Sequence, residues 1–181
     1  MVMSLLMLAG CAAQRLRPDQ QLLGAQEQRE AHLAKTADWS LNGRLAISGP
    51  DEGGSGSVLW IQRGDAYQFT LIAPVTGKTW TLSGDQDRSE LAGVRAQPVH
   101  GASASQLLEA ELGWQVPVAE LRYWARGARA PGRSELVFRA DGLPAELAQA
   151  GWKVEYLDYL DEGEPRLPRR VFMRNRARKF S

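Results

Sequence analysis

The sequence of 181 residues contains one cysteine and two histidines. A single cysteine excludes an internal disulfide, and these three residues supply too few ligands for a zinc site. The apolar run Met1–Gly10 is also far short of the roughly 20 residues that a membrane-spanning helix needs. We therefore predict neither a metal nor a transmembrane helix, and we interpret residues 1–10 as a targeting segment.

Patterns that indicate catalysis are equally scarce. Gly77-Lys78-Thr79 looks like the end of a phosphate-binding loop, but the position that requires its first glycine holds Ile72, and the residues that follow alternate like a strand. His100 lies near Ser103 and Ser105, without a nucleophile-elbow motif or an orienting carboxylate. The acidic cluster Asp158, Asp161, Glu162 and Glu164 has the composition of a solvated hairpin tip. We predict that the protein is not an enzyme and has no cofactor.

Acidic residues are absent from Pro165 onward, where seven residues are basic, while the preceding 164 residues hold 15 basic and 21 acidic residues. This basic strip consists of Arg166, Arg169, Arg170, Arg174, Arg176, Arg178 and Lys179. It suits anionic lipid head groups or an acidic protein partner, and equally a solvated strand edge protected against aggregation. We predict no nucleic-acid binding, since the aromatic residues lie elsewhere in the sequence.

The targeting segment ends in Leu8-Ala9-Gly10-Cys11, which resembles the bacterial lipobox. In that motif the cysteine receives a diacylglycerol, and the chain is then cleaved at its amine. We therefore divide the sequence into a cleaved signal peptide (1–10), a lipidated Cys11 with its tether (11–18) and one folded domain (19–181). Lipoproteins with Asp after the cysteine tend to stay in the inner membrane, so Ala12 predicts the outer membrane.

The periodicity of the domain changes from helical to strand-like near Trp39. Residues 19–35 predict one surface helix that begins at Pro18-Asp19. Alternation with a period of two then predicts successive strands, interrupted by two short helices at 103–112 and 118–126. The predicted strands are 39–48, 57–63, 66–73, 78–83, 133–140, 152–160 and 167–173, with a loop at 49–56. Short turns between the first strands indicate an antiparallel meander.

Large apolar side chains, including six tryptophans, are abundant in these strands and helices. They suit either a binding cavity for an apolar ligand or an ordinary filled core. Periodicity alone favours the filled core.

The residues nevertheless resemble the family of outer-membrane lipoprotein receptors called LolB over nearly the whole chain. The resemblance begins at Cys11 and includes Trp39-x-x-x-Gly43-Arg44-x-Ala46, Trp60-x-Gln62, Gly113-Trp114-x-Val116-Pro117-Val118, Leu121-x-x-Trp124-x-x-Gly127 and Gly151-Trp152-x-Val154-x-Tyr156-x-x-Tyr159. It implies an α+β, mainly antiparallel β fold: an incomplete, half-open β-barrel in which short helices cover an apolar cavity.

The resemblance also implies roles for individual residues. Acyl chains of a lipoprotein would be held by Trp60, Leu71, Leu82, Trp124, Trp152 and Tyr156. A protruding loop that aids membrane insertion corresponds to Pro74, Val75, Thr76 and Gly77, where the family's usual P-L-G reads P-V-T-G.

The family function implied is that of a monomeric receptor at the outer membrane that accepts acylated lipoproteins from the periplasmic carrier LolA and inserts them into the membrane. Two alternatives stay open: a lipid-anchored carrier of free phospholipid or glycolipid, and a scaffold lipoprotein with a filled core.

Overall fold

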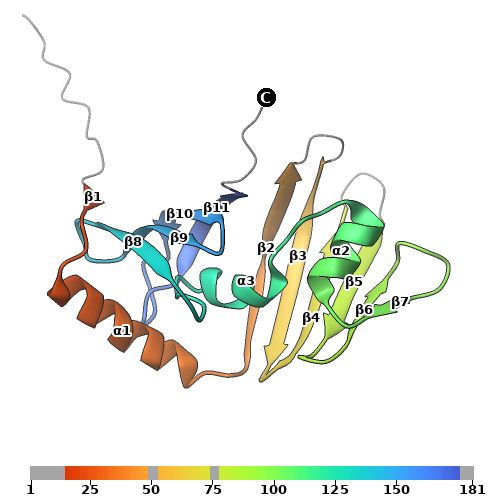
Figure 1. Ribbon diagram of the computed structural model, residues 1–181, viewed down its shortest axis with the longest axis horizontal. Coiled ribbons are helices and arrows are strands. Elements are labelled where there is room, and N and C mark those ends of the chain that lie inside the picture. Colours follow the sequence, from red (N-terminus) through yellow and green to blue (C-terminus); the bar gives the residue numbers. More distant parts are fainter. Residues whose placement is uncertain (1–14, 49–52, 74–77, 176–181) are drawn as a thin grey trace, which may run out of the picture. The chain divides into compact units, whose positions relative to one another are not determined.

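The computed structural model describes residues 15–48, 53–73 and 78–175, which form three helices and eleven strands (Figure 1). They divide into two compact units. The terminal unit joins the chain up to Glu30 to the stretch from Tyr123 onward, and the central unit is Ala31–Arg122. Among the described helices, none has the length and apolarity needed to cross a membrane. A single domain over residues 19–181 stays a prediction.

The central unit is built on a six-stranded antiparallel sheet whose strands are adjacent in chain order. The strands are β2 (Trp39–Ser48), β3 (Gly53–Arg63), β4 (Ala66–Ile72), β5 (Thr79–Gly84), β6 (Ser89–Ala92) and β7 (Val99–Gly101). Each pairs with the next, which confirms the predicted meander. β6 and β7 were not predicted, because runs of four and three residues are too short for alternation to reveal them.

The glycine-rich stretch before the second predicted strand was wrongly predicted as part of a loop. Gly53–Gly56 belong to β3 and pair with the end of β2, with Gly56 opposite Leu45. A side chain at Gly56 would collide with the backbone carbonyl of Ile72 on β4. This glycine therefore permits close approach of the neighbouring strand and does not mark a turn.

Two short helices follow the sheet, α2 (Ala104–Leu112) and α3 (Val118–Trp124), close to the predicted bounds. α2 ends at Gly113, whose φ of 68° is left-handed and whose N–H donates to the carbonyl of Glu109. The next N–H, of Trp114, donates to Leu108, which completes a glycine-capped helix end. Pro117 precedes α3 and accepts from Leu121, consistent with proline in a first helical turn.

The terminal unit contains a five-stranded antiparallel sheet in the order β1-β8-β9-β10-β11. The strands are β1 (Arg15–Leu16), β8 (Ser134–Arg139), β9 (Pro144–Gln149), β10 (Trp152–Tyr159) and β11 (Pro168–Asn175). β1 lies within residues 11–18, the stretch assigned from the sequence to the lipidated cysteine and its tether, and Arg15 pairs with Arg139. β9 was not predicted, because a proline, two alanines and a glutamate have low strand propensity.

Within the described ranges, no strand of one sheet pairs with a strand of the other. The fold is thus mainly antiparallel β with three short helices, and its barrel is incomplete, which confirms the predicted fold class.

Helix α1 (Gln20–Ala34) begins where Asp19 caps it, with the carboxylate of Asp19 accepting from the N–H of Leu22 at 2.8 Å. Two of its three buried residues, both polar, were not predicted. Gln26 and Arg29 are only 2% and 9% exposed, and Leu33 is also buried. Spacings of three and four residues place all three on one helix face. The buried face of α1 is therefore largely polar, and α1 is not the simple surface helix that its apolar residues predicted.

Arg29 holds three backbone carbonyls of the terminal unit. Its guanidinium donates to Gly127 at 2.9 Å, to Arg126 at 2.9 Å and to Arg166 at 2.6 Å. Gln26 donates a second hydrogen bond to the Gly127 carbonyl at 3.0 Å. Burial lowers the pKa of Arg29 from its ordinary value, but arginine stays charged at any physiological pH. A buried cation thus connects α1 to two loops distant in sequence.

Glu30 and Arg129 form a bidentate ion pair beside this contact. Arg129 Nε lies 2.9 Å from Glu30 Oε1, and Nη2 lies 2.8 Å from Oε2. Partial burial raises the pKa of Glu30, but the hydrogen bonds from Arg129 outweigh burial and leave the pKa below its ordinary value. The carboxylate is consequently ionised at neutral pH, and the pair fixes the segment after α3 against α1.

Candidate functional site

The inner face of the central sheet collects apolar side chains from five neighbouring strands. Three of the predicted cavity residues, Trp60, Leu71 and Leu82, lie on this face. Residues paired on neighbouring strands share a face, and Phe69 is paired with both Trp60 and Leu82, while Leu71 is paired with Val58. Trp60, Leu71 and Leu82 are each no more than 6% exposed. The structure thus brings these three residues together on one sheet face.

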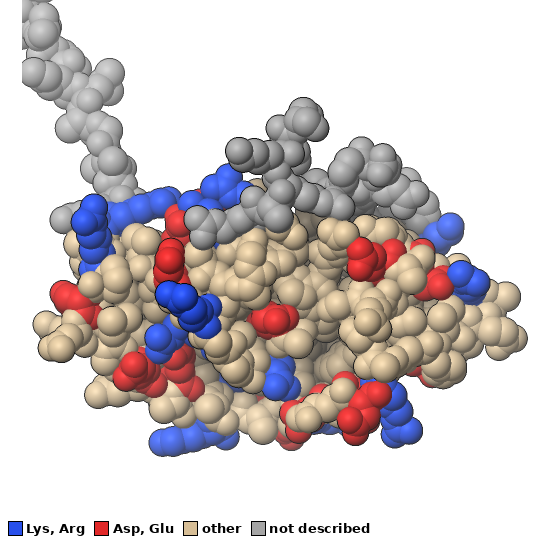
Figure 2. Space-filling view, in the orientation of Figure 1, with Lys and Arg blue, Asp and Glu red and all other residues tan. Residues whose placement is uncertain are grey.

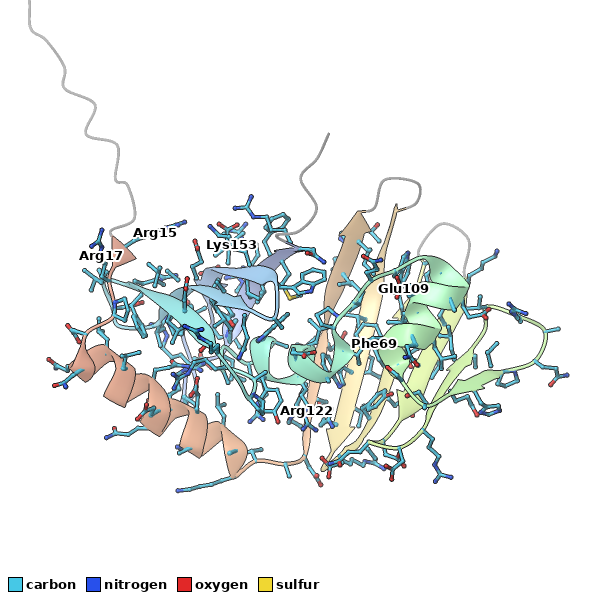
Figure 3. All side chains as sticks on the ribbon, in the orientation of Figure 1. Arg15, Arg17, Phe69, Glu109, Arg122 and Lys153 are labelled. Atoms are coloured by element: carbon cyan, nitrogen blue, oxygen red, sulfur yellow. The ribbon has the colours of Figure 1, made fainter. Side chains whose placement is uncertain are left out.

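Aromatic rings line this face where β2, β3 and β4 meet. The ring of Trp60 lies 5.0 Å from that of Trp39 and 5.8 Å from that of Phe69, which Figure 3 labels. The indole N–H of Trp60 donates to Gln62 at 3.1 Å, and Gln62 donates to the Gly64 carbonyl. These hydrogen bonds satisfy the polar atom of Trp60, so its ring contributes an apolar surface of fixed orientation.

Helix α2 covers one end of the same face (Figure 1). Leu107 and Leu108 of α2 pack with Leu82 and Leu91 of the sheet in one buried cluster. Trp114, just after α2, stacks edge-on against Trp80 of β5 at 5.4 Å. This end of the face is therefore filled by the protein's own side chains.

The opposite end of the face, on β2, is less covered. The inward-facing residues of β2 include Leu41, Leu45 and Ile47, which are only half-buried. On the neighbouring strand β3, the inward-facing residues Val58, Trp60 and Gln62 are buried. Leu41 pairs directly across Trp60. The sheet face thus runs from a filled end under α2 to a more accessible apolar end at β2.

The other three predicted cavity residues belong to the terminal unit. Trp124 is fully buried, and its indole N–H donates to Gln149 at 2.9 Å. Gln149 also accepts from the N–H of Ala130 and donates to its carbonyl. The ring of Trp152 lies 6.5 Å from that of Trp124 and is half-buried. Trp124 is therefore part of a hydrogen-bonded core as well as a predicted ligand contact.

Tyr156 is buried on the inner face of β10, and its hydroxyl has no hydrogen-bond partner among the described residues. Burial raises its pKa well above the ordinary value, so the group is a neutral phenol. A bulge after Tyr156 shifts the register of β10 and turns Tyr159 inward as well. The Tyr159 hydroxyl donates to the Pro144 carbonyl at 2.9 Å. Sequence alternation predicts Tyr156 but not Tyr159 in the core.

Two predicted sites lie outside the described residues: the lipidation residue Cys11 and the loop residues Pro74, Val75, Thr76 and Gly77. The residues that flank the loop are described. The N–H of Ala73 donates to the carbonyl of Lys78 at 2.9 Å, so the segment between them connects two paired strands, β4 and β5. The roles of these residues stay predictions.

The serine and histidine that the sequence offered as a nucleophile and base contact other parts of the central unit. The Ser105 hydroxyl accepts from the N–H of Val118 at 3.1 Å, and His100 on β7 lies 3.6 Å from Glu90. A pocket of about 230 Å³ in the terminal unit is polar and lies at the ends of the β8, β9 and β10 strands, around Arg133 and Gly151. The described residues contain no group of three potential metal ligands.

An open antiparallel sheet with an aromatic, helix-covered inner face defines the class of incomplete β-barrel proteins with an apolar interior. The chain belongs to the family described as outer membrane lipoprotein LolB, whose family model matches residues 37–180. Proteins named outer-membrane lipoprotein LolB are similar to it over most of their length. That of Nitrosococcus oceani is 36% identical over 175 residues, covering 95% of this chain and 87% of the relative. That of Stutzerimonas stutzeri is 37% identical over 92% of this chain and 82% of the relative, and that of Cellvibrio japonicus is 38% identical over 88% and 79%.

Proposed function

We propose that this protein is a lipid-anchored receptor that accepts lipoproteins from the periplasmic carrier LolA and inserts them into the outer membrane. Family membership supports the general role, an outer-membrane lipoprotein that acts in lipoprotein localisation. The observation that carries the finer proposal is the apolar face around Trp60, which is filled under α2 and more accessible at β2.

The physical problem that such a receptor solves is exposure of its cargo. Each acyl chain of a lipoprotein costs on the order of 10 kcal/mol to expose to water. An apolar sheet face removes this cost, because aromatic and aliphatic side chains replace water around the chain. Transfer then runs from a weaker site on the carrier to a stronger site here, and finally into the bilayer. In this proposal no nucleotide is consumed.

The test is a transfer assay in solution. The protein without its lipid anchor is mixed with LolA carrying a radiolabelled lipoprotein, and each protein is pulled down separately. Label should move to this protein without added nucleotide. If label stays on the carrier while the protein binds phospholipid, the phospholipid-carrier alternative replaces the proposal. If neither binds, the apolar face is only a core.

A matched pair of variants locates the site. Leu41→Asn places an amide on the inner face opposite Trp60 and should lower acceptance of labelled cargo roughly tenfold, because an apolar contact with the acyl chain is lost. Leu59→Asn makes the same change on the outer face, where Leu59 is 42% exposed, and should transfer normally. Equal transfer by both variants would remove the inner face from the mechanism.

The loop residue Val75 is expected to act in delivery and not in acceptance. Val75→Glu should leave label transfer from LolA intact and reduce incorporation into outer-membrane vesicles by on the order of 10- to 100-fold, because a carboxylate resists entry into the bilayer. Val75→Leu is the control and should deliver at least as well as the native protein. Normal incorporation by Val75→Glu would contradict the assignment of residues 74–77.

A further inference from the structure

The C-terminal hairpin, β10 with β11, exposes apolar and basic side chains together on the outer face of the terminal sheet. Phe172 is 51% exposed on β11, and Leu157, at the bulge of β10, is 49% exposed. Arg170 and Arg174 lie two residues either side of Phe172, and both are exposed on the same face. The combination of cationic and large apolar groups is typical of surfaces that bind at a membrane interface.

Most other charges on this face neutralise one another. Lys153 lies between Glu146 at 2.6 Å and Glu155 at 3.2 Å, and Arg15 lies 3.1 Å from Glu146. Arg169, beside Arg170, lies 3.7 Å from Asp158. Arg170 and Arg174 have no ion pair with any part of the chain that the structure describes. The face therefore carries an excess of positive charge on the edge strand, next to its exposed phenylalanine.

The predicted lipid anchor lies close in sequence to the same face. Cys11 precedes Arg15 by four residues, a span of at most about 14 Å. Arg15 is in β1 of this sheet, and its side chain reaches Glu146 on the outer face. In Figure 3, Arg15, Arg17 and Lys153 lie along one side of the terminal unit, and Figure 2 shows Lys and Arg gathered along the upper edge there. An anchor at Cys11 keeps this sheet within a short distance of the bilayer.

We infer that the outer face of the β10–β11 hairpin docks on an anionic phospholipid surface, with Arg170 and Arg174 at the head groups and Phe172 in the interface. The inference rests on the proposed function only for the anchor at Cys11. Docking by this face fixes how the terminal sheet is oriented on the membrane. An acidic protein partner would match the arginines but leaves Phe172 and Leu157 without an apolar environment, so the membrane is the better match.

The test uses the processed chain, residues 11–181 with Cys11→Ala, so that neither leader nor lipid contributes. Binding is measured by sedimentation with vesicles of phosphatidylcholine alone and with vesicles that also contain about 30 mol% phosphatidylglycerol as the anionic lipid. Binding should require phosphatidylglycerol and weaken as salt rises. Arg170→Gln with Arg174→Gln should weaken it roughly 25-fold, about fivefold for each arginine. Phe172→Ala should weaken it roughly tenfold.

The matched control removes two exposed arginines elsewhere, Arg63→Gln with Arg88→Gln, and should bind nearly as the parent does. All variants should unfold at the denaturant concentration of the parent, since the replaced side chains are exposed. Equal losses in both double variants, or no binding by the parent, would overturn the inference. So would unchanged vesicle binding with slower acceptance from LolA in Arg170→Gln with Arg174→Gln, which would assign the face to an acidic protein. Failure of the receptor proposal would be seen in a separate experiment, the transfer assay from LolA, which contains no membrane: no cargo would move to this protein.

Discussion

Replacing Cys11 with serine should move the protein from the outer membrane into the soluble periplasmic fraction once membranes are washed with high salt. Each CH₂ of an acyl chain that enters the bilayer contributes about 0.8 kcal/mol, so the two or three chains of a lipoprotein anchor hold the protein effectively permanently. Without them, what remains is a reversible contact through charged and partly exposed apolar side chains. The expected change in membrane partition is larger than for any other substitution considered.

The measurement is fractionation after a high-salt wash, and the Cys11→Ser variant is exported behind the leader of a soluble periplasmic protein. Radiolabelled palmitate provides a second readout, and Cys11 is the single cysteine of the sequence, so thiol attachment has one possible position. Ala12→Asp is the matched control, because it keeps the lipid and should move the protein to the inner membrane. Cys11→Ser protein that stays with membranes after the wash would exclude a lipid anchor at this residue.

The two contributions to membrane contact are separable by salt. At low ionic strength Cys11→Ser protein should retain weak binding through Arg170 and Arg174, and a high-salt wash should remove it, since screening acts on exposed charges. The acyl anchor is insensitive to salt because its free energy comes from burial of apolar surface.

Strands with clear alternation were predicted from sequence because one sheet face is buried and the other is solvated. In β2 the odd-numbered residues from Trp39 to Ile47 are half-buried and the even-numbered ones are exposed, which is the pattern that the sequence carries. β9 shows why alternation fails elsewhere. Its inward positions include Gln149, a polar residue that is buried because Trp124 and Ala130 satisfy its amide. A sequence pattern that counts apolar residues misses such a position.

The candidate site shows the same division. Trp60, Leu71 and Leu82 were predicted as members of one apolar surface, and register across β3, β4 and β5 places them on one face. Trp124 was predicted with them, but its hydrogen bond to Gln149 and complete burial in the terminal unit depend on pairings far apart in sequence. The bulge that turns Tyr159 inward breaks the period of two. No local spacing signals either feature.

Arg29→Met should lower the free energy of unfolding of the terminal unit by about 3–5 kcal/mol, because two of the three carbonyls that the guanidinium serves, those of Arg126 and Arg166, lose their charged donor. The Gly127 carbonyl keeps the hydrogen bond from Gln26. Methionine matches the length of the arginine stem, so the loss reports the hydrogen bonds more than packing. Urea unfolding followed by circular dichroism, with hydrogen exchange at residues 126–130, measures it.

Two further substitutions decide how the loss arises. Arg29→Lys keeps the charge but replaces the planar fork with a point cation, which cannot reach three carbonyls in the same geometry, so an intermediate loss is expected. Arg88→Met is the control for removing an arginine, since the Arg88 side chain is 86% exposed, and should change stability by less than about 0.5 kcal/mol. If Arg29→Met were as stable as the native protein, the desolvation cost of burying the cation would equal its hydrogen-bond contribution. The polar face of α1 would then determine the position of the helix without stabilising the fold.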